Sequence, residues 1–365
     1  MNTKIEIIAE AGVNHNGSLS MALDLIDLAA EAQADYVKFQ TFNSAKVVSR
    51  FAAKAEYQKR MTGEQDSQLE MIQKLELSEK DHFQLQEHCQ KRGIKFLSTP
   101  FDRDSLAFLD QKMRLDKFKI ASGELTNAPL IYDAGLSGKA LILSTGMASL
   151  SEIEKTLSLL AFCYVTQDPV PATDAKALQA AFASAEGQRA LRKNVTLLHC
   201  TTEYPAPYED VNLRAMHTMR AAFGLPVGYS DHTPGIHISL AAAAMGARLI
   251  EKHFTLDQNL PGPDHKASLT PHELCELVKN VRQITLALGE GLKVPQPSEI
   301  KNIDIARRSI VAADTIRKDD VFTIHNLELK RPGTGLSPFR YWSLLGKRAH
   351  KDYQADEEIR ESDAH

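Results

Sequence analysis

Eight short apolar runs recur along the chain, from Ile5 to Ile250, and alternate with stretches of helical periodicity. A strand that is followed by a helix and then by another strand pairs in parallel with that strand. Eight repeats of this unit close a (β/α)8 barrel. The sequence therefore predicts an α/β chain built on a TIM barrel. The runs are Ile5–Ala9, Tyr36–Phe39, Ile94–Leu97, Phe118–Ile120, Ala140–Leu143, Val195–Leu198, Val227–Tyr229 and Arg248–Ile250.

Polar side chains follow directly after these runs, at the C-terminal edge of each expected strand. In a barrel of parallel strands all C-terminal ends converge on one mouth, which is the face where such barrels carry out chemistry. We therefore expect the active site at this mouth. The residues at the strand edges include Glu10, Lys38, Gln40, Ser98, Thr99, Lys119, Ser122, Glu124, Ser144, Thr145, His199, Thr202, Tyr204, Ser230, Asp231, His232 and His253.

The chain has 365 residues, of which 43% are hydrophobic, enough for a barrel and a second small domain. A formal net charge of −4 provides no basic surface for nucleic acid, so the expected partners are small molecules. The sequence shows no signal peptide and no run near the ~18 apolar residues of a membrane helix. The four cysteines are far apart in the sequence, which favours reduced thiols and a cytoplasmic protein.

The character of the sequence changes after residue 289. Residues 1–289 hold the expected barrel, and residues 290–302, with their glycines and prolines, are typical of a linker. Residues 303–365 form a small β-rich domain. About 60 residues bury little core alone, so we expect this domain to lean on a barrel. Its strand-like pieces are Ser309–Ala312, Asp320–Phe322 and Leu327–Leu329.

Two stretches interrupt the alternation of strands and helices. Residues 42–77 make a connection too long for an ordinary loop, and they lie at the mouth, where lids over substrates occur. Residues 163–194 fall between a helix and the next strand, which places them at the opposite, N-terminal face of the barrel. We therefore expect a functional role for the first stretch and a surface elaboration in the second.

Two lysines, Lys38 and Lys119, end the second and fourth expected strands, close to hydroxyl side chains. Ammonium and hydroxyl groups together make a pocket for a phosphate or a carboxylate, so we expect a small, highly charged anion as ligand. One lysine at a strand end often extends into water, but two that point to one mouth favour binding. The hydroxyls belong to Ser122, Ser144 and Ser230.

His232 and His253 end two consecutive strands, so their imidazoles could lie side by side and share a divalent metal. A lone histidine at a strand end is more often a hydrogen-bonded structural residue, so both interpretations stay open. The same two interpretations apply to His199, which could be a third metal ligand or a structural residue.

Four carboxylates, Glu10, Glu124, Asp231 and Asp264, can accept a sugar hydroxyl, move a proton or orient an imidazole. For each of them a capping or solvated role is the alternative. The turn Asn14–Gly17 positions backbone, with Asn16 or Ser18 as the cap of the first helix, and we assign it no chemistry.

These residues together resemble the sialic acid synthase family, whose members condense phosphoenolpyruvate with an N-acetylated mannosamine-type sugar. The resemblance covers nearly the whole chain, and the number of ordered motifs makes it specific. The motifs are Ala9–Gly17, Val37–Phe42, Ser98–Asp102, Ser122–Glu124, Leu143–Met147, Leu198–Pro205, Gly228–Thr233, Glu251–Thr255 and Gly262–His265.

The resemblance implies a role for each polar residue at the mouth. It implies that His232 and His253 hold a divalent ion, Mn²⁺ first, with Mg²⁺ or Co²⁺ as alternatives, and that Glu10 lies where a proton moves. No organic cofactor is implied. The implied ligands of phosphoenolpyruvate are Lys38, Lys119, Ser122, Ser144 and Ser230. The implied ligands of the open-chain sugar are Gln40, Glu124, Tyr204 and Asp264, and Thr202 is a further candidate for substrate binding.

The implied reaction is an aldol-type condensation. The metal polarises the sugar aldehyde as a Lewis acid, C3 of phosphoenolpyruvate attacks it, and water adds to C2. Phosphate then leaves by C–O cleavage, which gives a nine-carbon 2-keto acid. The C-terminal domain resembles the family's antifreeze-like (SAF) domain, and this implies that Arg331 reaches the acyl group of a sugar bound in a partner subunit, in a domain-swapped homodimer.

The sugar itself is indicated by two motifs. Cys200–Pro207 and His265–Leu269 resemble the legionaminate synthases, which act on 2,4-diacetamido-2,4,6-trideoxymannose to give N,N'-diacetyllegionaminate. Thr202 stands where some N-acetylneuraminate synthases carry Asn. N-acetylmannosamine, for an N-acetylneuraminate synthase, and the pseudaminate precursor are the alternatives.

Other classes of function stay open on the residues alone. Lys38 or Lys119 could form a Schiff base, which would make the chain a pyruvate-type lyase without a metal. A barrel acting on a phosphorylated sugar would need a second cationic cluster, which the sequence does not offer. A carbohydrate- or ice-binding protein with an inert barrel would not need the polar strand ends.

Overall fold

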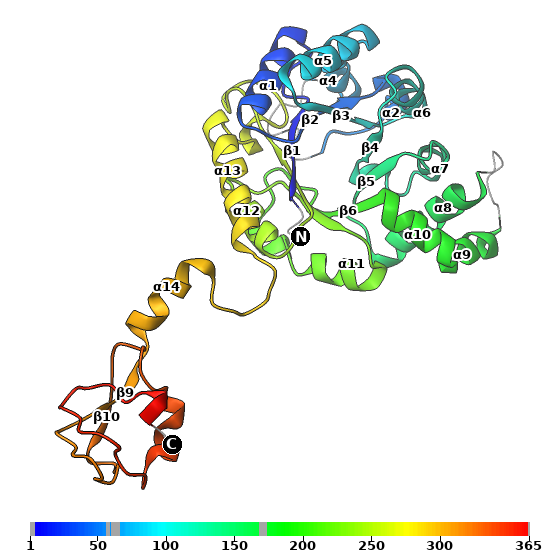
Figure 1. Ribbon diagram of the computed structural model, residues 1–365. Helices are drawn as coiled ribbons and strands as arrows, with labels where there is room; N and C mark the ends of the chain where they lie inside the picture. The colour runs from blue at the N-terminus through cyan, green and yellow to red at the C-terminus, as the bar shows by residue number, and fades with distance from the viewer. Residues whose placement is uncertain (1–3, 56–58, 60–65, 168–173, 364–365) are drawn as a thin grey trace. The chain divides into compact units, whose positions relative to one another are not determined.

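The computed structural model describes residues 4–55, 59, 66–167 and 174–363, and Figure 1 shows their arrangement. The chain divides into two compact units, residues 1–290 and residues 291–365. Among the described residues, no helix combines the length and the apolar character that crossing a membrane requires. All four cysteines are free thiols, and Cys275 is the exposed one.

The first unit is the predicted (β/α)8 barrel. Its eight strands pair in parallel in the order β3-β2-β1-β8-β7-β6-β5-β4, and β3 and β4, at the two ends of this order, pack side by side. Helices surround the strands (Figure 1). The strands are β1 Glu6–Gly12, β2 Tyr36–Thr41, β3 Lys95–Pro100, β4 Lys117–Ile120, β5 Ala140–Ser144, β6 Val195–His199, β7 Val227–Asp231 and β8 Leu249–His253.

The helices begin where the sequence provides caps. Ser78, Ser149 and Thr270 each form a capping box with the acidic residue three positions later, and Ser18 caps the first helix as predicted. The helices of this unit are α1 Leu19–Glu31, α2 Ser44–Val47, α4 Gln68–Gln73, α5 Glu79–Arg92, α6 Arg103–Ala107, α7 Ala128–Leu136, α8 Leu150–Thr166, α9 Ala175–Ala183, α10 Ala185–Asn194, α11 Ala215–Phe223, α12 His237–Ala244 and α13 Pro271–Ala287.

Alternation along the strands separates two buried layers. Residues that face outward pack with the helices in the main core, whereas a separate small cluster fills the inside of the barrel. The side chains two positions further along several of these strands are polar and point into the mouth, as Glu10 does after Ile8. The inner cluster consists of Ile8, Tyr36, Leu97, Ile142, Leu198 and Leu249.

The two interruptions contain secondary structure of their own. Residues 42–77 include α2 and α4, which pack against each other beside the mouth. In residues 163–194, α9 and α10 pack on α8, and α10 leads directly into the start of β6 (Figure 1). The second stretch therefore lies at the end from which the strands begin, away from the mouth.

The C-terminal unit has a small core of its own, which includes Ile310, Phe322 and Tyr353. Its antiparallel strands are β9 Ser309–Ala312 and β10 Leu327–Lys330, and its helices are α14 Pro297–Ala306 and α15 Tyr341–Leu344. The residues 290–302, which we interpreted as a linker, thus contain the first part of α14. Asp320–Phe322 is not a strand, since Val321 forms only an isolated bridge with Arg348.

Candidate active site

A cavity of about 300 Å³ opens at the C-terminal ends of the strands, of the size that small-molecule sites have. All but two of the residues predicted to bind metal or substrates line it, which confirms that strand ends remote in sequence converge there. The predicted residues in its lining are Glu10, Lys38, Gln40, Lys119, Ser122, Ser144, Thr202, Tyr204, Ser230, His232, His253 and Asp264.

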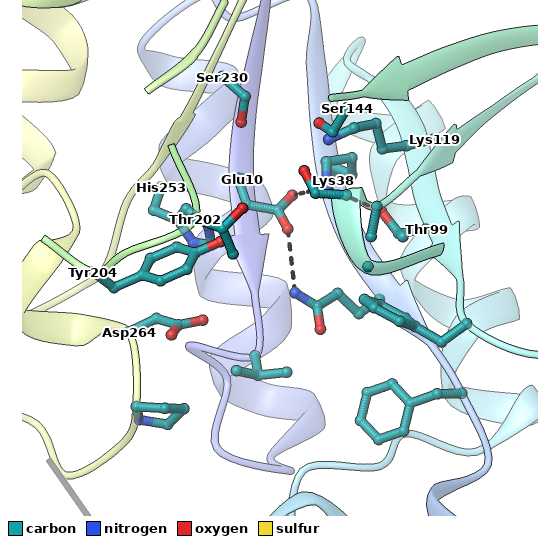
Figure 2. Close-up of a pocket in the computed structure, with 18 of the residues that line it drawn as sticks. Glu10, Lys38, Thr99, Lys119, Ser144, Thr202, Tyr204, Ser230, His253 and Asp264 are labelled. Atoms are coloured by element: carbon teal, nitrogen blue, oxygen red, sulfur yellow. Dashed lines mark hydrogen bonds and ion pairs between the residues drawn. The ribbon is translucent and has the colours of Figure 1, made fainter. Parts of the chain in front are cut away.

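Four buried charges form the floor of this pocket. Nζ of Lys38 lies 2.7 Å from Oε2 of Glu10 and 3.6 Å from Oε2 of Glu251, and Nζ of Lys119 donates to Oε1 of Glu251 at 2.6 Å. The strands β1, β2, β4 and β8 each contribute one of these side chains. Figure 2 shows the contact between Lys38 and Glu10 at the centre of the pocket. The floor thus holds two ammonium groups close together in a place that water reaches poorly.

The surroundings shift the pKa values of these groups in opposite directions. Burial raises the pKa of Glu10 to about 7, against the lowering effect of Lys38. Burial alone would raise the pKa of Glu251 too, but Lys119 and Lys38 lower it below its ordinary value. Burial lowers the pKa of Lys119, whereas the two carboxylates outweigh burial and raise the pKa of Lys38. A proton on Glu10 can therefore be moved near neutral pH.

Hydroxyl groups surround the two lysines. Thr99 accepts a hydrogen bond from Lys38 at 3.0 Å, and Ser230 donates to Glu251 at 2.8 Å. Ser122 accepts from the backbone N–H of Gly146 at 3.0 Å, and Ser144 is buried beside them. Figure 2 shows Lys38, Thr99, Lys119 and Ser144 on one side of the pocket. Such a set can bind the oxygens of an anion from several directions.

The two histidines lie together, as predicted, with ring centroids 5.7 Å apart. Nδ1 of His232 lies 2.6 Å from the carbonyl oxygen of Thr201, so this nitrogen carries the proton and Nε2, which has a long contact of 3.5 Å with the Ser230 hydroxyl, carries the lone pair. Burial lowers the pKa of His232 to about 4, and burial together with His232 lowers that of His253. Both imidazoles are therefore neutral at pH 7.

These properties are those of metal ligands. Within the described residues, Nδ1 of His253 is buried without a hydrogen-bond partner, which is costly unless something binds it. A neutral imidazole is the form that binds divalent ions. No group of three or more His, Cys, Asp or Glu side chains is arranged to hold a metal in the part of the chain that the structure describes. The histidine pair fits a metal that takes its other ligands from water or substrate.

The side of the pocket opposite the lysines carries groups suited to a polyhydroxy ligand. The ring of Tyr204 packs on that of His232, with centroids 4.2 Å apart, and Figure 2 shows Tyr204 and Asp264 on this side. Burial raises the pKa of Asp264 to about 6. Oγ1 of Thr202 is buried and has no hydrogen-bond partner among the described residues. Hydroxyl or amide groups of a ligand can form hydrogen bonds with the Asp264 carboxyl group and with Oγ1 of Thr202.

Several candidate residues lie elsewhere. Glu124 accepts a hydrogen bond from Asn127 at 2.7 Å and does not line the pocket, and Arg331 belongs to the C-terminal unit. Their roles stay predictions. His199 contacts the carbonyl oxygen of Val211 at 2.6 Å, outside this pocket, which favours its structural interpretation.

Asp231 points to the helices instead of the mouth, where Lys252 lies 3.1 Å from its carboxylate. Asp231 also accepts from the backbone N–H of Thr233 and from the hydroxyl of Ser239 on α12, which favours the capping role. We also predicted that Asn14–Gly17 positions backbone, and Asn14 donates to the carbonyl oxygen of Phe254 at 2.8 Å.

Glu251, the carboxylate that contacts both lysines, was not among the predicted site residues. The signal was present, because Glu251 precedes His253 by two positions on β8 and so faces the same side of the barrel wall. The hydrogen bond from Lys38 to Thr99 was not predicted either, although Thr99 was among the residues noted at the strand edges.

Comparison with known proteins identifies the family of this chain. The model of the NeuB family matches residues 25–293. The N,N'-diacetyllegionaminic acid synthase of Campylobacter jejuni is 51% identical, over 98% of this chain and 99% of that protein. The enzyme of the same description from Legionella pneumophila is 42% identical, over 96% of this chain and 91% of that protein.

This chain belongs to the NeuB family. A crystal structure of an N-acetylneuraminic acid (sialic acid) synthetase from Leptospira borgpetersenii shares its fold, with a TM-score of 0.65 and 36% identity. The superposition covers 83% of this chain and 91% of that one. The predicted membership in the sialic acid synthase family is thus confirmed.

Proposed function

We propose that this protein is a phosphoenolpyruvate-dependent synthase that joins phosphoenolpyruvate to an open-chain N-acetylated amino sugar. The observation that carries the proposal is the pocket floor, where two buried lysines and several hydroxyls lie beside two neutral histidines. The ammonium and hydroxyl groups can bind the oxygens of a trianionic substrate, and an aldehyde needs an electrophilic activator next to it.

Lys38 and Lys119, with Ser122, Ser144 and Ser230, bind phosphoenolpyruvate in this proposal. Both lysines are paired with carboxylates across the barrel, which holds the ammonium groups in place before the substrate enters. Fixed cations stabilise the charge that grows on a departing phosphate without rearranging during the reaction. Thr99 holds Lys38 from the β3 side.

His232 and His253 would hold the divalent metal, for which Mn²⁺ is our first choice. When bound, the metal would supply Lewis-acid polarisation of the sugar aldehyde. Glu10 lies in the floor beside Lys38, and with a pKa near 7 it can give or accept a proton during the addition of water to C2. Gln40, Thr202, Tyr204 and Asp264 orient the sugar above this floor.

The favoured sugar is 2,4-diacetamido-2,4,6-trideoxymannose, with N,N'-diacetyllegionaminate as product. The relatives support this choice, because identity is 51% with a diacetyllegionaminic acid synthase and 36% with a sialic acid synthetase. N-acetylmannosamine, which gives N-acetylneuraminate, and the pseudaminate precursor are the other acceptors to test.

One assay tests the proposal. The protein is incubated with Mn²⁺, phosphoenolpyruvate and each of the three sugars, while phosphate release and product mass are measured. We expect phosphate and a nine-carbon keto acid with the diacetamido sugar, loss of activity with EDTA, and recovery with Mn²⁺. Activity that survives EDTA but is lost on borohydride treatment with substrate would replace this proposal by the Schiff-base lyase.

We further propose that Arg331 of the C-terminal unit contacts the acyl group of the sugar in a domain-swapped homodimer. The support is the resemblance of this unit to the SAF domain of the family. Arg331→Ala should then raise the KM for the sugar by about tenfold and leave the KM for phosphoenolpyruvate unchanged. Equal effects on both substrates, or a monomer in analytical ultracentrifugation, would contradict the proposal.

A further inference from the structure

The pocket has two chemically different parts. Its floor consists of the charged and hydroxyl side chains at the strand ends, whereas one side of it is apolar. We call this side the apolar wall. The apolar wall consists of Phe42, Val47, Met71, Ile72, Leu75 and Phe101. Five of these six residues come from residues 42–77, the long connection that follows β2. The charged side chains of the floor are held by contacts with one another and not by this wall.

Packing contacts and hydrogen bonds hold the residues of the apolar wall in place. The rings of Phe42 and Phe101 meet edge to face with centroids 6.2 Å apart, and Met71 and Leu75 are buried. The backbone N–H of Asn43 donates to Asp102 at 2.9 Å, which fixes the start of this connection to the N-cap residue of α6. Ser67 and Glu70 form a capping box that starts α4. The apolar side chains are thus held in place from both ends.

Apolar side chains beside a sugar site have few partners to offer to hydroxyl groups. Placing a hydroxyl against them costs free energy, since the hydroxyl loses water without gaining a hydrogen bond. A methyl group in the same place gains about 0.8 kcal/mol for each buried carbon. The wall therefore distinguishes acceptors by how many methyl groups they present.

We infer that the apolar wall selects the acceptor sugar by its methyl groups, an inference that rests on the proposed function. The aldehyde carbon must reach phosphoenolpyruvate at the floor, so C4 to C6 of the open-chain sugar extend toward the rim. There Asp264 and Tyr204 line the pocket on one side (Figure 2), and the wall lines it on the other.

The candidate acceptors differ in the groups that would meet the wall. The 2,4-diacetamido-2,4,6-trideoxy sugar has a methyl group at C6 and a second acetyl methyl at N4. N-acetylmannosamine carries hydroxyl groups at both of these positions. Differences of this kind in an apolar pocket change kcat/KM by roughly 10- to 200-fold. The wall thus favours the deoxy, diacylated class of acceptor.

Single hydroxyl groups introduced into the wall test the inference. Val47→Thr and Ile72→Thr place a hydroxyl at half-buried wall positions, while Ala45→Thr and Gln73→Thr place the same residue at exposed positions of the same two helices. The measured quantity is the ratio of kcat/KM for the diacetamido sugar to kcat/KM for N-acetylmannosamine. We expect each wall variant to lower this ratio about tenfold and each control to leave it unchanged.

The KM for phosphoenolpyruvate shows whether the floor is intact, and it should stay within about twofold in all four variants. Equal losses with both sugars, an unchanged ratio, or a parallel rise in the KM for phosphoenolpyruvate would overturn the inference. Failure of the proposed function would look different, because the unmodified protein would then release no phosphate with any of the sugars.

Discussion

Two sets of buried lysine and carboxylate side chains lie on opposite faces of the same barrel wall. The inner set joins Lys119 to Glu251 at the mouth, and the outer pair joins Lys252 to Asp231 beneath the helices. Glu251 and Lys252 are consecutive residues of β8, so the alternation of the strand sends one side chain to each face. The same kind of ion pair therefore occurs on both faces of the barrel wall, once in the pocket and once beneath the helices.

The outer pair is saturated with hydrogen bonds. Asp231 accepts from the backbone N–H and the hydroxyl of Thr233, both at 2.8 Å, and from the hydroxyl of Ser239 at 2.6 Å. Lys252 donates to the carbonyl oxygen of Thr233. Nothing in this arrangement is left for a ligand, and the pair ties β7 and β8 to the start of the next connection.

The inner set is incomplete by comparison. Oε2 of Glu251 has only the long ion-pair contact with Lys38, at 3.6 Å, and Nδ1 of the neighbouring His253 has no hydrogen-bond partner among the described residues. A buried polar atom without a partner costs about 1–3 kcal/mol, so a structural role alone does not account for the His253 nitrogen. Saturation of the hydrogen-bonding atoms, more than burial or charge, thus separates a structural ion pair from a binding site.

The largest expected effect separates the two sets by activity. Lys119→Met should lower kcat/KM for phosphoenolpyruvate by about 10³-fold, because a fixed cation in a dry site is lost. Its free energy of unfolding should fall by only about 1–2 kcal/mol, since Lys38 still lies near Glu251. Steady-state phosphate release and urea unfolding measure the two quantities. Activity within threefold of the unmodified protein would mean that the inner set is structural as well.

The outer pair should show the reverse pattern. Lys252→Met leaves the Asp231 carboxylate buried without its cation, and we expect the free energy of unfolding to fall by about 3–5 kcal/mol. The KM for phosphoenolpyruvate of the folded protein should not change.

The double variant Lys252→Met/Asp231→Asn is the matched control. With the buried charge removed as well, it should recover about 2 kcal/mol of the loss in urea unfolding. A double variant no more stable than Lys252→Met would show that the hydrogen bonds of Asp231, and not its charge, determine the cost.

Most of the barrel could be predicted from the sequence, because apolar runs and capping residues are local signals. All eight strands were found, yet several extend further than their apolar runs, as β8 does from Ile250 to His253. Ladder hydrogen bonds are made by the backbone, so a polar side chain does not end a strand. Asp320–Phe322 shows the opposite error, since an apolar piece that pairs at one residue only is not a strand.

The site was predictable as a set of strand ends but not in every member. We grouped Asp231 with the functional carboxylates and gave Glu251 no role, because a one-residue shift decides which face a side chain takes. The apolar wall was recognised only as a long connection beside the mouth. Its side chains come from two short helices, α2 and α4, and from the loops beside them, whose packing depends on residues distant in sequence, such as Asp102.

The smallest expected effect concerns Asp264, a buried carboxylate whose pKa is shifted by burial and not by a lysine. Burial raises its pKa from the ordinary 3.8 to about 6, so between these values the folded state binds more protons than the unfolded state. Stability attributable to this group therefore falls as the pH rises from about 4 to about 6. Asp264→Asn should raise the free energy of unfolding by about 3 kcal/mol at pH 8 and by about half as much at pH 5. Asp231→Asn, by contrast, should lower the free energy of unfolding at both pH values. Urea unfolding measures the change for each variant. A change of the same sign in both variants would remove the distinction between these two carboxylates.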